Sequence, residues 1–378
     1  MKPGSFYVFL GAAVIVTAAA GLTAWQRAAA TLGTVASETV LPGLIARVND
    51  VATIELVKGK DKIEVQRTGE GWVMPDRGGY PVKFEVVKQN IVTMGELKTV
   101  EPKTGKADLH SRIEVEDPAG PDTKSAQITL KGADGKQIAA LIVGRKRYAP
   151  IGGKDMVYIR KPGDNRAWLA EGVFDLRTPA PEWLVKEISG IKEERFKTLT
   201  FTHPDGSSVN MRRKDVPKTD AKDPKQQENA MLQEQWEVEG RPAERALKPP
   251  ATVNSTASAY NFLSLDDVKP AKEVEDGTAK AQSEFVAEDG LIMRSRMVEN
   301  GDTVWTMFEA ATTPAAAQEI KDEATALNKK VVGWAYKLPE YKQNFLSRKF
   351  DDLVEPVRNT EKNEDKKDEE PKTESKGG

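Results

Sequence analysis

The order of apolar and polar residues predicts strands at the start of the main body of the chain. Apolar residues alternate with polar ones over residues 54–56 and again over 63–65, on either side of a turn at Gly59. A period of two is typical of strands that bury one face. We therefore predict a hairpin, followed by a third strand around Trp72.

A corner with the sequence Gly-Gly-Tyr-Pro, residues 78–81, separates this predicted strand from a stretch with helical periodicity. Spacings of three and four residues place apolar side chains on one face of a helix, with charged residues between them. We predict a helix of about four turns. Its apolar positions are Phe84, Val87, Ile91, Met94 and Leu97.

The same order of elements recurs in the second half of the chain. Residues 199–211 predict a second hairpin, Trp236 follows it as Trp72 follows the first, and residues 251–274 predict a second helix with its exit strand. Asp-Gly and Gly-Asp pairs favour hairpin turns further along each half, because such turns require positive φ. In this alignment Trp168 corresponds to Trp305. The predicted fold class is α+β, with an N-terminal transmembrane helix followed by two tandem copies of an antiparallel-sheet-plus-helix unit.

A chain of 378 residues is long enough for two to three domains. Two polar stretches contain too little apolar surface to offset the entropy of ordering, one inside the second half and one at the C-terminus. The predicted organisation is residues 1–27 as a transmembrane anchor or signal segment, 28–48 as a linker, 49–190 as the first α+β copy, 191–355 as the second copy with an inserted loop near 214–234, and 356–378 as a disordered charged tail.

The N-terminus contains a long uncharged run. No charged residue lies between Lys2 and Arg27, and Tyr7 and Trp25 lie near its two ends. About 20 apolar residues span a bilayer as a helix, and aromatic residues favour its two interfaces. We predict a single-pass protein of the bacterial inner membrane with its body in the periplasm or otherwise extracytoplasmic. The alternative is a signal peptide cleaved after the small residues 18–20.

Four residues are candidates for a corner of the fold that could stack on a ligand. They are Trp72, Tyr80, Pro81 and Trp236. Because a Trp follows the hairpin in both halves while the polar residues differ, we interpret the four as a structural corner in which each Trp covers its own sheet. The alternative is an aromatic platform for a ligand such as a sugar ring.

The chemistry of the side chains gives little support to an enzyme. The chain has no Cys, two His and a net charge of −2, which leaves no electrostatic reason to expect nucleic acid, an acidic substrate or an anionic membrane surface. It contains neither a Gly-x-Ser-x-Gly elbow nor a phosphate-binding Gly-Lys-Ser loop. We predict no catalytic residue, no cofactor and no metal ligand.

One cluster contains the residue types that bind metals. It consists of Asp108, His110, Glu114 and Glu116. Short acidic runs in loops are usually solvated, and we favour that interpretation over a metal site. His203, the second histidine, lies in a His-Pro-Asp-Gly sequence that predicts a hairpin tip.

Several segments resemble a bacterial family of unknown function, the DUF4340-type family. They are "GWVMPDRGGYPVKFEVVKQNIVTMGELKTVEPKT", "DLHSRIEVEDP", "ITLKGADGKQIAALIVG" and "RAWLAEG". His110 stands where the family usually has Tyr, and Glu114 where it usually has Gly. Members of this family are membrane-anchored and often encoded beside gliding-motility-type ABC transporters, and the family supplies no established site residues.

The resemblance implies a non-enzymatic, membrane-anchored accessory component of a gliding-type or export ABC transport system. Its expected partners are the inner-membrane permease of that system or related envelope subunits, with no nucleic acid. Two other functions stay open from the sequence. One is an envelope glycan- or peptide-binding module with its groove between the two copies, and the other is a hydrolase, because paired carboxylates are brought together only by the fold.

Overall fold

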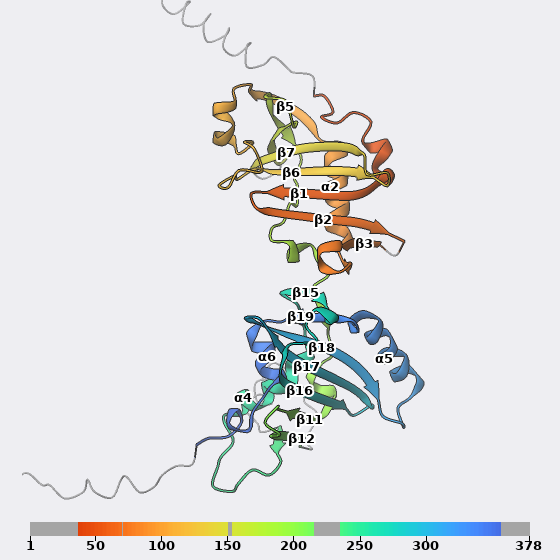
Figure 1. Ribbon diagram of the computed structural model, residues 1–378, viewed down its shortest axis with the longest axis vertical. Coiled ribbons are helices and arrows are strands. Elements are labelled where there is room, and N and C mark those ends of the chain that lie inside the picture. The colour runs from red at the N-terminus through yellow and green to blue at the C-terminus, as the bar shows by residue number, and fades with distance from the viewer. Residues whose placement is uncertain (1–36, 70, 150–152, 215–234, 357–378) are drawn as a thin grey trace, which may run out of the picture. The chain divides into compact units, whose positions relative to one another are not determined.

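The structure is a computed structural model that describes residues 37–69, 71–149, 153–214 and 235–356 (Figure 1). The chain divides into two compact units. The first unit contains the residues up to Asp76 together with Pro81–Trp183, and the second contains Arg77–Tyr80 and the chain from Leu184 onward.

A nine-stranded antiparallel sheet forms most of the first unit, in the order β4-β3-β2-β1-β6-β7-β8-β9-β5 (Figure 1). The hairpin predicted from the alternating pattern is present, because Leu56 pairs with Ile63 and both side chains are buried. The strands are β1 (Val51–Lys58), β2 (Asp61–Thr68), β3 (Gly71–Met74), β4 (Tyr80–Pro81), β5 (Lys98–Thr104), β6 (Ala126–Gly132), β7 (Gln137–Arg147), β8 (Met156–Arg160) and β9 (Ala167–Glu171).

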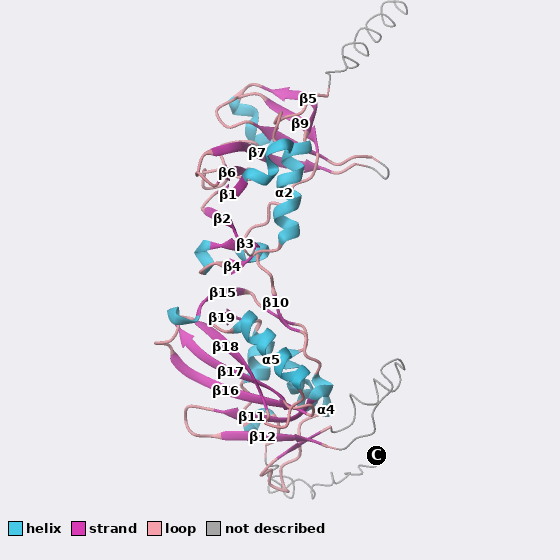
Figure 2. Ribbon diagram, turned by 90° about the vertical axis from the view of Figure 1, so that its right-hand side faces the viewer, coloured by secondary structure: helices cyan, strands magenta, loops and turns pink. Residues whose placement is uncertain are grey.

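Helix α2 (Phe84–Glu96) covers one face of this sheet (Figure 2). It agrees with the predicted helix, and its buried side includes Val87, Ile91 and Met94 at the expected helical spacing. Three short 3-10 helices complete the unit: η1 (Ile45–Asp50), η3 (Ala107–Ile113) and η4 (Ala180–Trp183). A further one, η2 (Pro75–Arg77), follows β3.

The second unit is built on an eight-stranded antiparallel sheet, in the order β13-β12-β11-β16-β17-β18-β19-β15 (Figure 1). Its core contains aromatic rings packed edge to face, such as Phe285 with Phe196 and Tyr260 at centroid distances of 5.3 and 5.2 Å. The strands are β11 (Phe196–Thr202), β12 (Ser208–Arg213), β13 (Trp236–Val238), β15 (Asp267–Pro270), β16 (Thr278–Ala287), β17 (Leu291–Asn300), β18 (Thr303–Thr312) and β19 (Trp334–Lys337), with β10 (Glu187–Ser189) and β14 (Leu263–Ser264) forming a separate pair.

Helices lie beside the second sheet, and α5 is the longest (Figure 2). The guanidinium group of Arg195 binds Asp289 in the β16–β17 turn at 2.7 Å and Glu323 on α5 at 2.8 Å, which ties the helix to the sheet. The helices are α4 (Pro250–Asn254), α5 (Gln318–Val331) and α6 (Glu340–Leu346), with short 3-10 helices η5 (Glu193–Arg195), η6 (Ser255–Tyr260), η7 (Ala271–Glu273) and η8 (Phe350–Asp352).

The two sheets have the same strand order when β3, β2, β1, β6, β7, β8, β9 and β5 are matched with β13, β12, β11, β16, β17, β18, β19 and β15. The predicted match of Trp168 with Trp305 is wrong, because Trp168 lies on β9 and Trp305 on β18, the counterpart of β8. The reason is helix α5, which separates β18 from β19 where the first sheet has only a tight turn at Gly163.

The predicted fold class is corrected by these observations. The described residues form two large, mainly antiparallel sheets of nine and eight strands, and not an anchor helix followed by two small sheet-plus-helix units. In the described part of the chain, no helix is long and apolar enough to cross a membrane. The longest, α2 and α5, have 13 and 14 residues, short of the ~20 that a span needs.

The predicted localisation, a single-pass inner-membrane protein with a periplasmic body, is corrected on the same finding. Its predicted anchor, residues 1–27, lies outside the described residues, as do the inserted loop at 215–234 and the tail from residue 357.

Candidate binding groove

The four residues of the predicted corner are divided between the two units. Trp72 and Pro81 belong to the first unit, and Tyr80 and Trp236 belong to the second. Trp72 is 8% exposed on β3 and Trp236 is 1% exposed on β13, so little of either ring is open to a ligand. Pro81 is exposed but has no aromatic face.

Tyr80 is buried among aromatic side chains of the second unit. Its ring meets the rings of Trp334 and Tyr336 edge to face, at centroid distances of 5.0 and 6.2 Å, and its hydroxyl donates to Val185 O at 3.2 Å. Burial raises the pKa of Tyr80 to about 12. The side chain is therefore a neutral packing residue across the physiological pH range.

Two of the four residues with metal-binding chemistry, His110 and Glu116, are held in structural bonds. His110 is buried on η3, and its Nε2 lies 2.9 Å from Asn165 O. One oxygen of Glu116 accepts from the N–H of Lys124 at 2.7 Å and from the Thr123 hydroxyl at 3.2 Å. Within the described residues, no group of three or more His, Asp or Glu side chains is arranged to hold a metal ion.

The second histidine is also bonded to the main chain. His203 is buried at the β11–β12 turn, and its Nε2 lies 3.1 Å from Arg348 O. The predicted hairpin tip is present at this position, because the strand pairing closes at Thr202 and Ser208.

A groove of about 520 Å³ lies at the start of helix α2, in the first unit. A volume of this size is within the usual range for small-molecule sites. Phe84, on the first turn of α2, lines the groove and is 58% exposed. The lining residues are Lys83, Phe84, Glu85, Val86, Gln89, Asp175 and Arg177.

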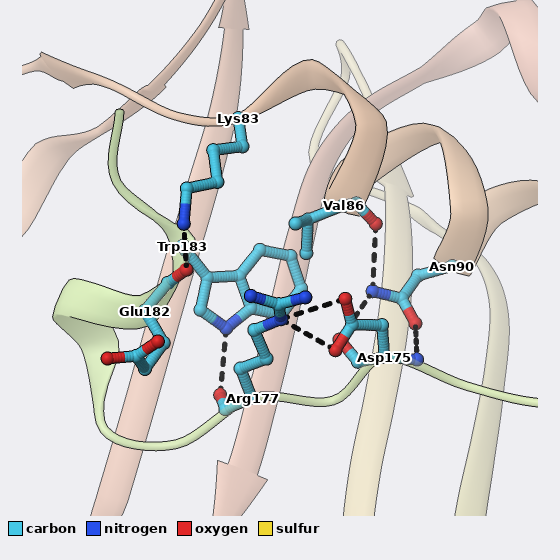
Figure 3. A network of polar contacts seen from close by, with 7 residues as sticks. All are labelled: Lys83, Val86, Asn90, Asp175, Arg177, Glu182 and Trp183. Atoms are coloured by element: carbon cyan, nitrogen blue, oxygen red, sulfur yellow. Dashed lines mark hydrogen bonds and ion pairs between the residues drawn. The ribbon is translucent and has the colours of Figure 1, made fainter. Parts of the chain in front are cut away.

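The opposite wall of the groove is a segment that helix α2 holds in place (Figure 3). Asn90 is fully buried, and its amide donates to Asp175 O at 3.0 Å while its Oδ1 accepts from the Asp175 N–H at 3.0 Å. Thr93, one turn further along, donates to Val173 O at 3.0 Å. The two side chains satisfy main-chain groups that have no strand partner, so the segment has one defined position.

Trp183 closes the other end of this segment (Figure 3). Its indole ring is fully buried, and its Nε1 donates to Arg177 O at 2.8 Å. The main-chain N–H of Lys83 donates to Trp183 O at 2.8 Å, and Lys83 Nζ donates to Glu182 O at 3.2 Å. These bonds fix the residue that precedes helix α2 to the segment that faces it.

The charges in the groove are mixed. Arg177 Nε donates to both carboxylate oxygens of Asp175, at 2.7 and 2.8 Å, and this bond raises the pKa of Arg177. The N-terminal end of α2 adds a partial positive charge at the same place. The groove therefore offers an exposed ring, cations and a carboxylate, which suits a ligand that combines apolar and polar groups.

The sequence did not indicate the residues that build this groove. Asn90 lies on the inward side of the predicted helix, and a polar residue at such a position is the one signal that could have pointed to it. Asp175, Arg177 and Trp183 occur in a stretch with neither strand nor helix periodicity.

Comparison with known proteins identifies the family. Residues 72–275 match the model of the family described as Domain of unknown function (DUF4340). The match covers more than half of the chain, and the protein belongs to this family. No curated protein and no solved structure matches the chain significantly.

Proposed function

We propose that the protein is a non-enzymatic accessory component of an ABC transport system of the gliding or export type, with the permease or a related envelope subunit as its partner. The resemblance to membrane-linked proteins encoded beside such transporters supports this proposal. The observation that supports the non-enzymatic part of the proposal concerns the two histidines, which are both buried and bonded to main-chain carbonyl groups. Groups that serve the fold in this way are poorly placed for proton transfer.

The test is co-purification from native membranes in a mild detergent, with an affinity tag on the full chain at its natural expression level. We expect a permease and its ATPase to be recovered in amounts comparable to that of the tagged chain, and the tagged permease to recover this chain in turn. Recovery of the chain without any ABC subunit in both directions would contradict the proposal.

The groove beside helix α2 favours a second candidate function, a module that binds an envelope glycan or peptide. An exposed aromatic ring beside hydrogen-bonding groups is the arrangement that such ligands use. Phe84 and Arg177 supply these two components at one site.

Binding of peptidoglycan fragments and of short peptides to the purified chain tests this candidate. Phe84→Ser should weaken binding about tenfold or more if the ring is a contact residue. Tyr341→Ser is a matched control, because Tyr341 is 53% exposed and lies on α6 in the second unit. Equal binding by both variants and the parent would exclude the groove as the ligand site.

A further inference from the structure

A bulge in strand β7 redirects a basic side chain at one end of the first sheet. Val143 pairs with Ile159 and Lys146 with Val157, so Gly144 and Arg145 together face the single residue Tyr158. Bulges of this kind re-aim the side chains they contain. The guanidinium group of Arg145 donates to Arg112 O and lies 5.9 Å from the centroid of the Tyr158 ring.

A second cation shares that ring. Lys103 Nζ, on β5, also lies 5.9 Å from the centroid of Tyr158. Cations are attracted to the face of an aromatic ring, and this attraction offsets part of their mutual repulsion. Tyr158 therefore gathers positive charge from strands at separate positions in the sheet.

The strand then continues with more exposed basic residues. Lys146 and Arg147 follow the bulge on opposite faces of the hairpin, and neither forms an ion pair with any residue that the structure describes. Tyr148 comes next and is 69% exposed.

Two of the three carboxylates nearby are paired with lysines, and the third accepts a main-chain hydrogen bond. Glu171 binds Lys154 at 2.6 Å, Glu101 binds Lys103 at 2.7 Å, and Asp155 accepts from the N–H of Ala149 at 2.9 Å. Asp155 keeps its negative charge, and the three cations Arg145, Lys146 and Arg147 outnumber it, so the end of β7 has a local excess of positive charge in a chain whose net charge is −2. We call this region the basic hairpin surface, defined by Arg145, Lys146, Arg147, Tyr148 and Tyr158.

We propose that the basic hairpin surface binds the headgroups of anionic phospholipids, as a peripheral contact with a membrane surface. Adjacent Lys and Arg residues are attracted to anionic lipids, and a neighbouring exposed Tyr suits the headgroup region because its ring is amphipathic. A nucleic acid would favour a domain with a strong overall basic charge, which this chain lacks. The inference does not depend on the transport role proposed above.

Vesicle flotation with the full chain tests this inference. The vesicles contain either phosphatidylcholine alone or phosphatidylcholine with ~30% phosphatidylglycerol, at low and at high salt. Both variants and the parent retain the same N-terminal apolar run. The quantity compared is therefore the difference in vesicle binding between the two lipid compositions, and not total binding. The test variant is Lys146→Gln with Arg147→Gln, and the control is Lys60→Gln with Lys62→Gln, two exposed cations at the β1–β2 turn.

Each charge removed from a lipid-binding surface lowers the partition coefficient about fivefold. We therefore expect the extra binding caused by phosphatidylglycerol to fall about 25-fold in the test variant and to stay within about twofold of the parent in the control. High salt should abolish this extra binding in the parent. Tyr148→Ser should weaken vesicle binding a few-fold further, in a manner insensitive to salt.

Three outcomes would overturn the inference. One is an equal loss in the test and control variants, which would mean that only net charge matters. Another is unchanged extra binding caused by phosphatidylglycerol in the test variant, with a normal melting curve. The third is binding of poly-glutamate that depends on Lys146 and Arg147 while vesicle binding does not, which would assign the surface to an acidic polypeptide.

Discussion

Gly144 lies against the main chain of Glu114, so closely that a side chain at Gly144 has no room. A Cβ atom placed on Gly144 would be 2.5 Å from Glu114 O and 2.5 Å from Ile113 O. Glu114 itself has φ 61°, in the left-handed region that costs energy for a residue with a side chain. The bulge of β7 and the end of η3 are therefore fitted to each other.

This contact predicts that Gly144→Ala destabilises the first unit. The methyl group would meet two main-chain oxygens, which cannot rotate away as a flexible side chain could, and overpacking of this kind costs about 1–3 kcal/mol. The free energy of unfolding from denaturant titration measures the effect. Gly105→Ala is the matched control, because nothing lies within 4 Å of its Cβ position, and it should change stability by less than about 0.5 kcal/mol.

The interpretation of Trp72 and Trp236 as packing residues leads to a second prediction. Truncation of either buried ring to Ala should lower the free energy of unfolding by about 3–5 kcal/mol. Phe84→Ala, at an exposed ring, should have little effect on stability. A Trp72→Ala chain that melts like the parent but loses a ligand or partner would show that the ring is a binding platform after all.

Asn90 supplies a third prediction, concerning the groove. Asn90→Ala would leave the N–H and C=O of Asp175 without their amide partner, and a buried unpaired polar group costs about 1–3 kcal/mol. We expect a loss of about 2–4 kcal/mol in stability, because two main-chain groups are affected. Hydrogen exchange should show faster opening of residues 173–177 than in the parent, with strands β1 and β6 unchanged. An unchanged exchange rate in that segment would mean that Trp183 alone positions it.

Parts of this fold could be predicted from the sequence because their signals are local. The alternation in β1 and β2 and the helical spacing from Phe84 to Leu97 depend only on neighbouring residues. The role of Asn90 depends on Asp175, 85 positions away, and Asn328 forms the same paired bonds with Ala310 on β18. In both cases the partner is an ordinary peptide group, which leaves no mark in the sequence.

The match of Trp168 with Trp305 failed for a related reason, although the two sheets share their strand order. Turn chemistry at Gly163 and Gly301 is alike, and the alignment equated the two turns. In the structure one joins β8 to β9 and the other joins β17 to β18, because α5 occupies the later connection. The local positive charge on β7 could not be predicted from the net charge either. The net charge sums the charges of all strands and does not show which part of the fold carries the cations.

The buried histidines give a fourth prediction. The double variant His110→Ala and His203→Ala should complement a deletion strain once protein levels are matched, because each ring is bonded to a main-chain carbonyl. Its free energy of unfolding should nevertheless fall by about 1–3 kcal/mol at each site, because a buried carbonyl loses its donor. Loss of complementation at normal abundance and stability would assign a chemical or binding role to one histidine, with His110 beside Asp108 and Glu114 as the first place to examine.

Lys342 predicts how stability depends on pH. Its ammonium group is buried on α6 and donates to Ser258 O at 2.6 Å and to Asn261 O at 2.5 Å. Burial lowers the pKa of Lys342 to about 8, against a small opposing effect of Glu193. Between pH 8 and the ordinary lysine pKa, the unfolded chain therefore binds more protons at this residue than the folded chain does. Under that condition the free energy of unfolding rises with pH.

We expect this residue to add up to about 2 kcal/mol to the stability between pH 8 and 9.5, since one proton over one pH unit corresponds to about 1.4 kcal/mol. The window stops there because buried tyrosines such as Tyr260, whose pKa burial raises, begin to favour the unfolded state as free tyrosines ionise near pH 10. Denaturant titrations of the parent and of Lys342→Met across this range isolate the contribution, because the methionine cannot titrate. A rise of the same size in both proteins would show that another group causes it. It would also show that burial beside the carbonyl groups of Ser258 and Asn261 does not lower the pKa of Lys342.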